Sequence, residues 1–200
     1  MKKLFIYPTF YKKLKRGPQV ILPKDIGIIL AYTGVNKESI CVDAGTGSGW
    51  LAVSLATIAK KVSTYEIRDD FAKIAEKNIQ LLELNNITLK NKDVTKKIDE
   101  KDADIFTLDM PNAEKALKNV KKALKVNGIV AAYIPHMEQV VKFSNTLKKL
   151  NFKEVHVVEC ILRDILVREE GMRPTTKGIW HTAYLIFARK AEELQSTKNT

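Results

Sequence analysis

Short apolar runs alternate with segments of helical periodicity along most of the chain. The apolar runs predict strands at residues 39–43, 62–66, 87–90, 103–108, 129–134, 152–160 and 180–188. Apolar positions at helical spacing predict helices at residues 26–32, 50–60, 69–84, 113–125 and 138–150. This alternation predicts an α/β fold, in which helices cover both faces of a mostly parallel sheet.

Residues 163–178, between the last two predicted strands, contain no helix-sized apolar segment. We therefore expect these strands to form an antiparallel pair that a long loop connects. Two polar positions mark helix ends. Asp25 is a candidate cap for the first helix, and Asn127-Gly128 is expected to close the helix at residues 113–125.

The chain is strongly basic, with 34 Lys and Arg residues against 23 Asp and Glu residues and a net charge of +11. This excess favours a polyanionic partner, nucleic acid first and an acidic membrane surface second, although a solvated lysine surface gives the same count. The N-terminal arm, residues 1–24, combines seven basic residues with four aromatic ones and has no acidic residue. Such an arm can bind phosphates and stack on bases, or pack its aromatic side chains on the core. Residues 25–190 are expected to form one domain, followed by a polar tail at residues 191–200.

Cysteine and histidine usage argues against a metal site. Cys41 and Cys160 lack metal-ligand spacing and are too few for a disulfide scaffold, and the three histidines are scattered. No apolar region typical of a signal peptide is visible, and the longest charge-free stretch, residues 44–59, is shorter than the ~20 apolar residues of a membrane-spanning helix. The sequence predicts a cytoplasmic protein without membrane attachment.

The first predicted strand leads directly into the sequence Asp43-Ala44-Gly45-Thr46-Gly47-Ser48-Gly49. Its glycines allow a sharp turn and a close approach of a ligand to the main chain. A Walker A loop needs a lysine after its last glycine, and none occurs before Lys60; a dinucleotide-binding loop needs a third glycine where Trp50 stands. The remaining pattern, G-x-G-x-G two residues after an acid, resembles the S-adenosylmethionine (SAM) site of class I methyltransferases.

An acidic residue also ends the second predicted strand, and another follows the third. Glu66 is placed to accept hydrogen bonds from both ribose hydroxyls of SAM, and Asp93 from its adenine amino group. Asp43 suits the positive ammonium or sulfonium region, through a water molecule. The alternative is a glycine-rich turn in an unrelated α/β domain, but such a turn needs no acids at three successive strand ends. We therefore predict SAM binding.

Asp109-Met110-Pro111 follows the fourth predicted strand, at the sheet edge where this architecture binds ligands. A carboxylate there can contact the substrate, or it can cap the next helix, although Asn112 is closer to the start of that helix. We favour a catalytic role for Asp109.

Several segments together resemble the tRNA (adenine-N1)-methyltransferases. The most specific are Pro23-Lys24-Asp25 and the run His181-Thr182-Ala183-Tyr184-Leu185. The others are residues 16–22, 31–34, 44–49, 65–72, 108–111, 172–174 and 186–190. The resemblance implies a class I SAM-dependent methyltransferase (Rossmann-like) fold, with a mostly parallel seven-stranded sheet and an antiparallel last strand. It also implies N1-methylation of adenine 58, and in archaea also adenine 57, in the T loop of tRNA.

The resemblance further places Gln19 near the cofactor and makes Asp109 the residue that contacts the target base. The predicted cofactor-binding residues are Gln19, Asp43, Gly45, Thr46, Gly47, Ser48, Gly49, Glu66, Ile67, Asp93 and Asp109. By accepting a hydrogen bond from the 6-amino group of adenine, Asp109 would raise the electron density at N1 and stabilise the cationic product. The base must leave its stack, and Tyr32, Tyr133 and Tyr184 are candidates to stack on it.

Two further residues are candidates for the substrate side. Arg173, in the long loop, is expected to bind phosphates together with the basic N-terminal arm. His181 is expected to orient the loop rather than to act as a base. The resemblance also implies a homotetramer.

The sequence departs from the family pattern in three places. Residues 1–24 are too short for the small β-rich domain that usually precedes the catalytic one, Asn112-Ala113-Glu114 stands where Pro-Trp is common, and Trp180 replaces a usual glycine. Two other functions remain as alternatives. A small-molecule or protein methyltransferase, of the precorrin or isoaspartyl type, fits poorly with the charge and the His-Thr-Ala-Tyr-Leu run. A non-catalytic tRNA-binding subunit fits poorly with the intact cofactor acids.

Overall fold

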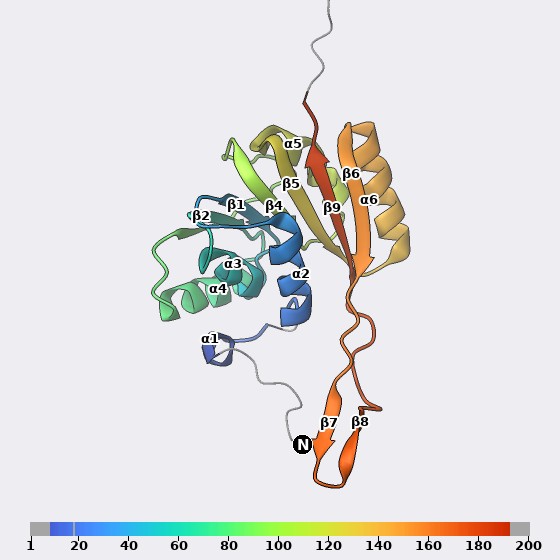
Figure 1. Ribbon diagram of the computed structural model, residues 1–200. Coiled ribbons are helices and arrows are strands. Elements are labelled where there is room, and N and C mark those ends of the chain that lie inside the picture. Colours follow the sequence, from blue (N-terminus) through green and yellow to red (C-terminus); the bar gives the residue numbers. More distant parts are fainter. Residues whose placement is uncertain (1–8, 18, 193–200) are drawn as a thin grey trace, which may run out of the picture.

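The main sheet of the protein has seven strands, which Figure 1 shows in a computed structural model that describes residues 9–17 and 19–192. The strands are β1 (Ile40–Ala44), β2 (Lys61–Tyr65), β3 (Ile87–Lys90), β4 (Ala103–Leu108), β5 (Leu124–Ile134), β6 (Phe152–Glu159) and β9 (Tyr184–Lys190). Their order across the sheet is β3–β2–β1–β4–β5–β9–β6. Strands β1 to β5 pair in parallel, while β9 pairs antiparallel with both β5 and β6. The predicted α/β sheet with an antiparallel last strand is confirmed.

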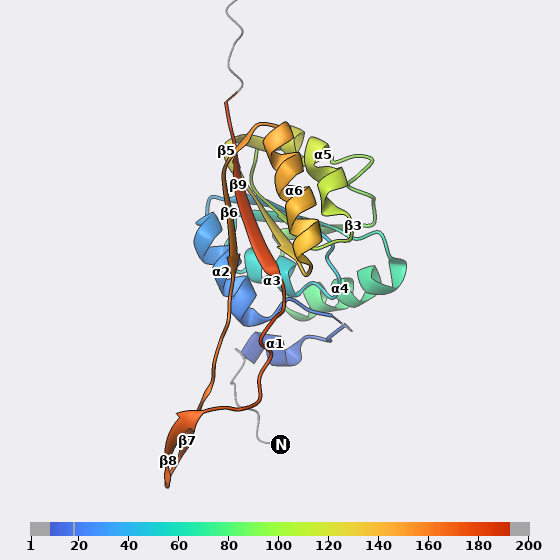
Figure 2. The same cartoon turned by 90° about the vertical axis from the view of Figure 1, so that its right-hand side faces the viewer.

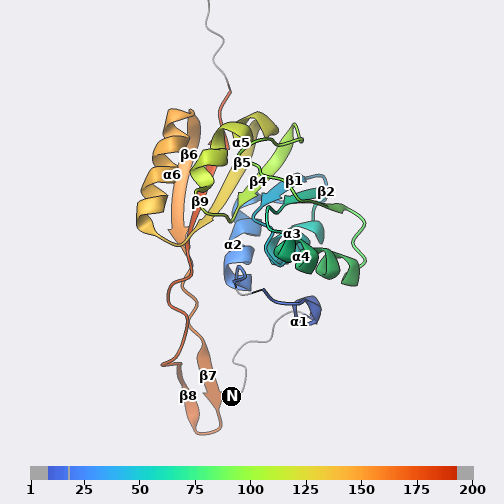
Figure 3. The ribbon, with the colours of Figure 1, turned by 180° about the vertical axis from the view of Figure 1, so that it is seen from behind.

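Helices cover both faces of this sheet (Figures 1 and 3). They are α1 (Thr9–Lys13), α2 (Pro23–Thr33), α3 (Trp50–Ala56), α4 (Asp69–Leu81), the 3₁₀ turn η1 (Ala113–Ala116), α5 (Leu117–Ala123) and α6 (Met137–Lys149). Two apolar clusters fill the layers, one beneath α1, α2 and α3 and the other beneath α5 and α6. Cys41 is fully buried in the first cluster, as its place in a strand predicts.

The periodicity of α4 shows how the sequence specifies one of these helices. Its inward face consists of Ala72, Ala75 and Asn78, spaced three residues apart, and all three are buried. Asp69 and Asp70 lie in the first turn, where negative charge is favourable next to the unpaired N–H groups. Asn78 is a polar residue on an otherwise apolar face, and it is fully buried.

A two-stranded hairpin projects from the body of the protein, as Figure 2 shows most clearly. It consists of β7 (Ile165–Arg168) and β8 (Gly171–Pro174), paired antiparallel. Because β9 is antiparallel to both β5 and β6, strand β6 runs in the same direction as β5. The hairpin, which follows β6, therefore leaves the sheet at the end where β1, β2 and β4 also finish. Helix α1 lies at this same end (Figure 1).

Three local predictions were wrong. Residues 163–178, expected as a long loop, contain the hairpin. The helix expected at residues 113–125 ends at Ala123, because Leu124 pairs with Ala103 at the start of β5. Asn127, expected at the end of that helix, has a φ of 64° inside β5.

Asp25 is not a helix cap. Helix α2 begins two residues earlier, at Pro23, after Leu22 at the N-cap position. Proline suits this position, since the first turn of a helix has no partner for its backbone N–H. Asp25 instead lies in the first turn and is fully buried.

The expected domain at residues 25–190 stays a prediction. The sheet, helices α3 to α6 and the hairpin lie within it, but α1 precedes residue 25, α2 begins at Pro23, and Tyr11 and Leu14 are buried in the core. Residues 1–8 and 18 of the expected N-terminal arm, and residues 193–200 of the expected tail, lie outside the described part of the chain. Within the described part, no helix has the length and apolar character needed to cross a lipid bilayer.

Candidate functional site

The glycine loop, residues 45–49, begins where β1 and β4 end side by side. Gly45 has a φ of 87°, and a Cβ at this position would lie 1.8 Å from the backbone oxygen of Asp109. The amide of Asp109 donates to the oxygen of Ala44 over 2.8 Å, which holds the two strand ends together. Any side chain at residue 45 would therefore collide with the main chain of the segment that carries the predicted catalytic residue.

Asp43 lies on β1 with 1% of its surface exposed, and its side chain connects β1 to β2 and β4. Its two carboxylate oxygens accept hydrogen bonds of 2.6 Å from the hydroxyls of Thr64 on β2 and Thr107 on β4. The Thr64 hydroxyl also lies 2.5 Å from that of Thr46 in the glycine loop. Burial raises the pKa of Asp43, and the two threonine hydroxyls oppose that rise. The side chain thus fixes the loop relative to β2 and β4, while its predicted water-mediated contact with a positive ligand stays a prediction.

Glu66 follows β2 and reaches back to the glycine loop. One carboxylate oxygen accepts from the backbone N–H of Gly47 over 2.8 Å, and the other accepts from the N–H of Arg68 over 3.0 Å. The side chain is buried, whereas that of Ile67 is 64% exposed. A carboxylate held by backbone donors retains free lone pairs with which to accept from hydroxyl groups.

Asp93 lies in the segment between β3 and β4, residues 91–102. Its Oδ1 accepts from the backbone N–H of Thr95 over 2.8 Å and from the Thr95 hydroxyl over 2.7 Å. The hydroxyl of Thr95 lowers the pKa of this carboxyl, which is therefore ionised at neutral pH. The amide of Asn119 on α5 holds the same segment by donating to the carbonyls of Val94 and Thr95, over 3.0 and 2.9 Å.

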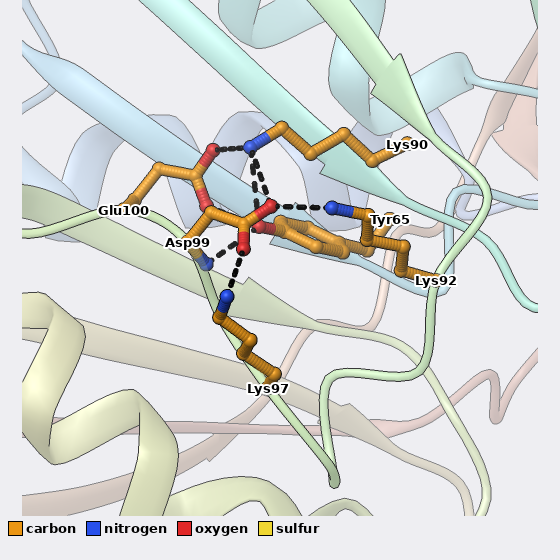
Figure 4. A network of polar contacts seen from close by, with 6 residues as sticks. All are labelled: Tyr65, Lys90, Lys92, Lys97, Asp99 and Glu100. Atoms are coloured by element: carbon orange, nitrogen blue, oxygen red, sulfur yellow. Dashed lines mark hydrogen bonds and ion pairs between the residues drawn. The ribbon is translucent and has the colours of Figure 1, made fainter.

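A polar network fixes the far end of this segment (Figure 4). The hydroxyl of Tyr65, the last residue of β2, donates to Glu100 and accepts from the backbone N–H of Asp99 over 3.0 Å. The ammonium of Lys90 donates to Glu100 over 2.5 Å, and Lys92 donates to Asp99 over 2.8 Å. Hydrogen bonds to Tyr65 and Lys90 support the ionised form of Glu100, whose pKa is lowered despite its burial. Both ends of the segment that carries Asp93 are therefore anchored.

Asp109 is partly buried. Burial raises its pKa to about 7, with further contributions from the negative charges of Asp43 and Glu66. A carboxyl with such a pKa changes its charge close to neutral pH, which is frequent among groups that take part in catalysis.

The remaining predicted cofactor residues lie on or next to the glycine loop. Thr46 and Ser48 are buried, and the Ser48 hydroxyl has no hydrogen-bond partner among the described residues. Gln19 is exposed. Two positions before it, a Cβ on Gly17 would lie 3.5 Å from the Cβ of Ser48, so the N-terminal segment passes directly over the loop.

The two substrate candidates lie apart from this set. Arg173 is exposed on β8, in the projecting hairpin, and the structure does not bring it to the strand ends. His181 lies at the base of the hairpin: Nδ1 is 2.6 Å from Glu159 and Nε2 is 2.9 Å from the oxygen of Pro135. Both ring nitrogens thus face acceptors, which raise the pKa of the imidazole, Glu159 most. The contacts tie His181 to the last residue of β6 and to the chain after β5, while its expected orienting role stays a prediction.

The candidate tyrosines differ in their surroundings. The ring of Tyr32 already stacks on Phe187 and His156, with centroid distances of 5.1 and 5.7 Å. Tyr184 lies against His181. Tyr133 is partly buried, and burial together with the nearby Asp25 raises its pKa to about 12.

A buried ion pair at the base of the hairpin was not predicted from the sequence. Lys24 and Asp25 have side-chain exposures of 8% and 0%, and Lys24 Nζ lies 2.7 Å from the carboxylate. Lys24 also donates to the carbonyl of Cys160 over 2.6 Å and to the hydroxyl of Thr182 over 2.8 Å. Thr182 donates in turn to Asp25 over 2.8 Å. In the sequence, the Pro-Lys-Asp and His-Thr-Ala-Tyr-Leu segments stood out only as the most specific part of the family resemblance. That specificity did not assign a role to Lys24, Asp25 or Thr182.

With this geometry established, comparison with known proteins identifies the family. A family model described as "tRNA methyltransferase complex GCD14 subunit" matches residues 8–177. The chain belongs to the GCD14 family. The predicted resemblance to tRNA methyltransferases is therefore confirmed.

Comparison of this GCD14 family member with individual proteins supports the same assignment. It is 38% identical to a tRNA (adenine(57)-N(1)/adenine(58)-N(1))-methyltransferase, TrmI, of Methanocaldococcus jannaschii, over 94% of this chain and 78% of that protein. The crystal structure of the tRNA (m1A58) methyltransferase TrmI from Aquifex aeolicus matches with a TM-score of 0.87 and 30% identity, over 93% of this chain and 77% of that one. A Thermotoga maritima structure described as a SAM-dependent O-methyltransferase matches with a TM-score of 0.88 and 33% identity, over 94% and 73% of the two chains. The fold is thus that of the SAM-dependent methyltransferases.

Proposed function

We propose that the protein is a SAM-dependent tRNA methyltransferase that forms N1-methyladenosine in the T loop, at position 58 and also at position 57. Membership of the GCD14 family and the similarity to the M. jannaschii enzyme support the reaction. The observation that carries the site is that three acidic residues meet the glycine loop: Asp43 through Thr64 and Thr46, Glu66 at the N–H of Gly47, and Asp109 through its main chain at Gly45. Since tRNA is the substrate, we expect the protein to act in the cytoplasm.

The residues at the strand ends fit SAM. Gly45 keeps the end of β1 free of a side chain, Glu66 is held to accept from ribose hydroxyls, and the Ser48 hydroxyl has no partner among the described residues. Asp93 is the predicted acceptor for the adenine amino group. It accepts both hydrogen bonds from Thr95 at Oδ1 and neither of them at Oδ2. When bound, SAM supplies a methyl group that is already activated by the adjacent sulfonium.

The contribution of Asp109 is electrostatic. Its carboxylate accepts a hydrogen bond from the 6-amino group of adenine, which increases the electron density at N1 and stabilises the positive charge that develops on the ring. The ionised form is required, and a cation bound at the strand ends favours it by lowering the pKa of a carboxyl that burial has raised. Much of the remaining rate comes from holding N1 in line with the transferred methyl group.

The test is incubation of the protein with SAM and unmodified tRNA, followed by mass spectrometry of nucleosides and of T-loop fragments. We expect N1-methyladenosine at positions 58 and 57, and Asp109→Ala should lower kcat about 100-fold or more with little change in SAM affinity. SAM binding without transfer to tRNA would instead indicate a small-molecule or protein methyltransferase. Absence of SAM binding in calorimetry would indicate a non-catalytic subunit.

For tRNA docking, we propose the basic part of the N-terminal arm. Lys12, Lys13, Lys15 and Arg16 are all exposed, and they lie at the end of the sheet where the cofactor residues gather. Their replacement by glutamine should weaken tRNA binding and flatten its dependence on salt concentration, because fewer phosphate counterions are released. SAM affinity serves as the internal control.

For oligomerisation, we propose that the hairpin contacts further copies of the chain in a homotetramer. In the hairpin, Ile165, Val167 and Met172 are 51%, 71% and 72% exposed. The flanking segments expose Ile161, Leu162, Ile179 and Trp180. Apolar surface of this extent is typical of protein interfaces. Sedimentation of the double variant Val167→Lys, Met172→Lys should show smaller species than the wild-type protein.

A further inference from the structure

Asn78 is a fully buried polar residue that connects two segments far apart in the sequence. Its amide nitrogen donates to the carbonyl of Lys15 over 2.8 Å and to the carbonyl of Ser48 over 2.7 Å. Its oxygen accepts from the backbone N–H of Lys15 over 2.8 Å. One side chain thus pairs with both backbone groups of the N-terminal segment, defined as residues 9–17, and with the glycine loop.

The N-terminal segment has a second attachment, on the helix that follows the glycine loop. The ring of Tyr11 stacks on that of Trp50 with a centroid distance of 4.8 Å. Its hydroxyl lies 2.5 Å from that of Ser54, which donates in turn to the carbonyl of Trp50. Tyr11 is 6% exposed, so this contact is part of the core.

At Gly17, the last residue of the N-terminal segment, the main chain itself contacts the neighbouring side chains. A Cβ on Gly17 would lie 3.2 Å from the ring of Phe71 and 3.5 Å from the Cβ of Ser48. The guanidinium of Arg68 lies 4.0 Å from the centroid of the Phe71 ring, and the backbone N–H of Arg68 donates to Glu66. The segment therefore lies against the glycine loop and next to the residues that hold Glu66.

We propose that Asn78 is a positioning residue for cofactor binding, and that the N-terminal segment forms one wall of the SAM site. Asn78 holds Ser48, and with it the glycine loop, at a fixed position relative to residues 15–17. The wall carries the basic side chains Lys12, Lys13, Lys15 and Arg16 on its outer side. This inference rests on the proposed function for the identity of the cofactor, and it adds a residue that touches neither SAM nor tRNA.

The test is Asn78→Asp, which keeps the shape and one acceptor but removes both donated hydrogen bonds. Asn86→Asp is a matched control, because the Asn86 amide also donates to two backbone carbonyls, those of Ala56 and Ala59, at the opposite end of α3. We expect Asn78→Asp to raise the KM for SAM about tenfold, with kcat at saturating SAM within about twofold of wild type. Asn86→Asp should leave the KM for SAM unchanged. Equal KM values in the two variants would overturn the proposal, as would a loss confined to kcat.

A second variant tests the wall from its other attachment. Tyr11→Ala removes the stacking on Trp50 but leaves the hydrogen bonds of Asn78 in place, and it should also raise the KM for SAM. An unchanged KM for SAM would show that Asn78 acts on the glycine loop alone. That result would contradict the proposal that the N-terminal segment forms a wall of the SAM site.

A third measurement needs no cofactor. Trypsin should cleave after Lys15 and Arg16 at least about tenfold faster in Asn78→Asp than in Asn86→Asp, as mapped by mass spectrometry. Equal cleavage rates would overturn the proposal. If the wild-type protein fails to bind SAM, the proposed function is wrong, and this comparison still decides whether Asn78 holds the segment.

Discussion

Gly45 and Asp109 lie in direct main-chain contact, so that a Cβ on Gly45 would be 1.8 Å from the Asp109 oxygen. The glycine loop and the predicted catalytic segment therefore cannot be varied independently. Asp109 can take its position only because residue 45 has no side chain.

Gly45→Ala should destabilise the protein by more than about 3 kcal/mol, because it combines a backbone collision with a φ of 87° that alanine rarely adopts. Gly27→Ala is the control. Gly27 lies within helix α2 with no atom within 4 Å of an added Cβ, and alanine there should stabilise by about 0.5–1 kcal/mol. Urea denaturation measures both changes. A Gly45→Ala variant as stable as the wild type would show that the strand ends separate readily.

The raised pKa of Asp109 predicts a pH dependence of stability. The folded state holds the proton up to a pKa of about 7, whereas the unfolded chain releases it near the ordinary value of 3.8. This group therefore contributes stability below pH 4, and the contribution is lost as the pH rises through 7. Asp109→Asn should gain about 1 kcal/mol or more relative to the wild type between pH 5 and pH 8 in the absence of ligand. A difference between the two proteins that does not change with pH would mean that Asp109 is not desolvated.

The buried pair of Lys24 and Asp25 predicts an asymmetric response to mutation. Lys24→Met leaves a fully buried carboxylate without its ammonium partner and should cost about 3–5 kcal/mol, as measured by chemical denaturation. The double variant Lys24→Met, Asp25→Leu should recover a large part of this loss, because no unpaired charge remains. Glu154→Gln, in the exposed pair with Arg189, should cost less than about 1 kcal/mol. If Lys24→Met proves as mild as this control, the ion pair is hydrated in solution.

The network around Tyr65 predicts a local effect on the segment that carries Asp93. Tyr65→Phe removes the hydroxyl that binds Glu100 and the amide of Asp99, and should cost about 1–3 kcal/mol. Hydrogen exchange should accelerate in residues 91–102 more than in the strands of the sheet. Lys92→Met, which removes one of the two exposed ammonium partners of Asp99 and leaves Lys97, serves as the control and should change exchange much less. Uniform acceleration over the whole chain would contradict an anchoring role.

The sequence predicted the layered sheet because its strands are buried and its helices have one apolar face. It did not predict the hairpin, because Val167 and Met172 are exposed and no buried face imposes a pattern on β7 and β8. It also did not show that β9 enters between β5 and β6, since strand order depends on contacts that periodicity does not record.

The candidate site was predictable as far as it follows from topology. Parallel strands end at one edge, so the acids near the end of β1 and directly after β2 and β4 (Asp43, Glu66 and Asp109) could be placed there from the sequence. The roles of Asn78 and Lys24 were not predictable. Apart from the contact of Lys24 with its neighbour Asp25, each makes its hydrogen bonds to residues more than 25 positions away, and a buried amide or ammonium in a helix looks in the sequence like an ordinary surface residue.

The place of β9 bears on how the protein is made. Until residues 184–190 have left the ribosome, β5 and β6 have no strand between them, and both present open backbone edges to the surrounding solution. The nascent chain therefore carries a gap in its sheet from the completion of β6 until β9 has emerged. Closing it needs pairings of high sequence separation, which form slowly and leave incomplete chains prone to association.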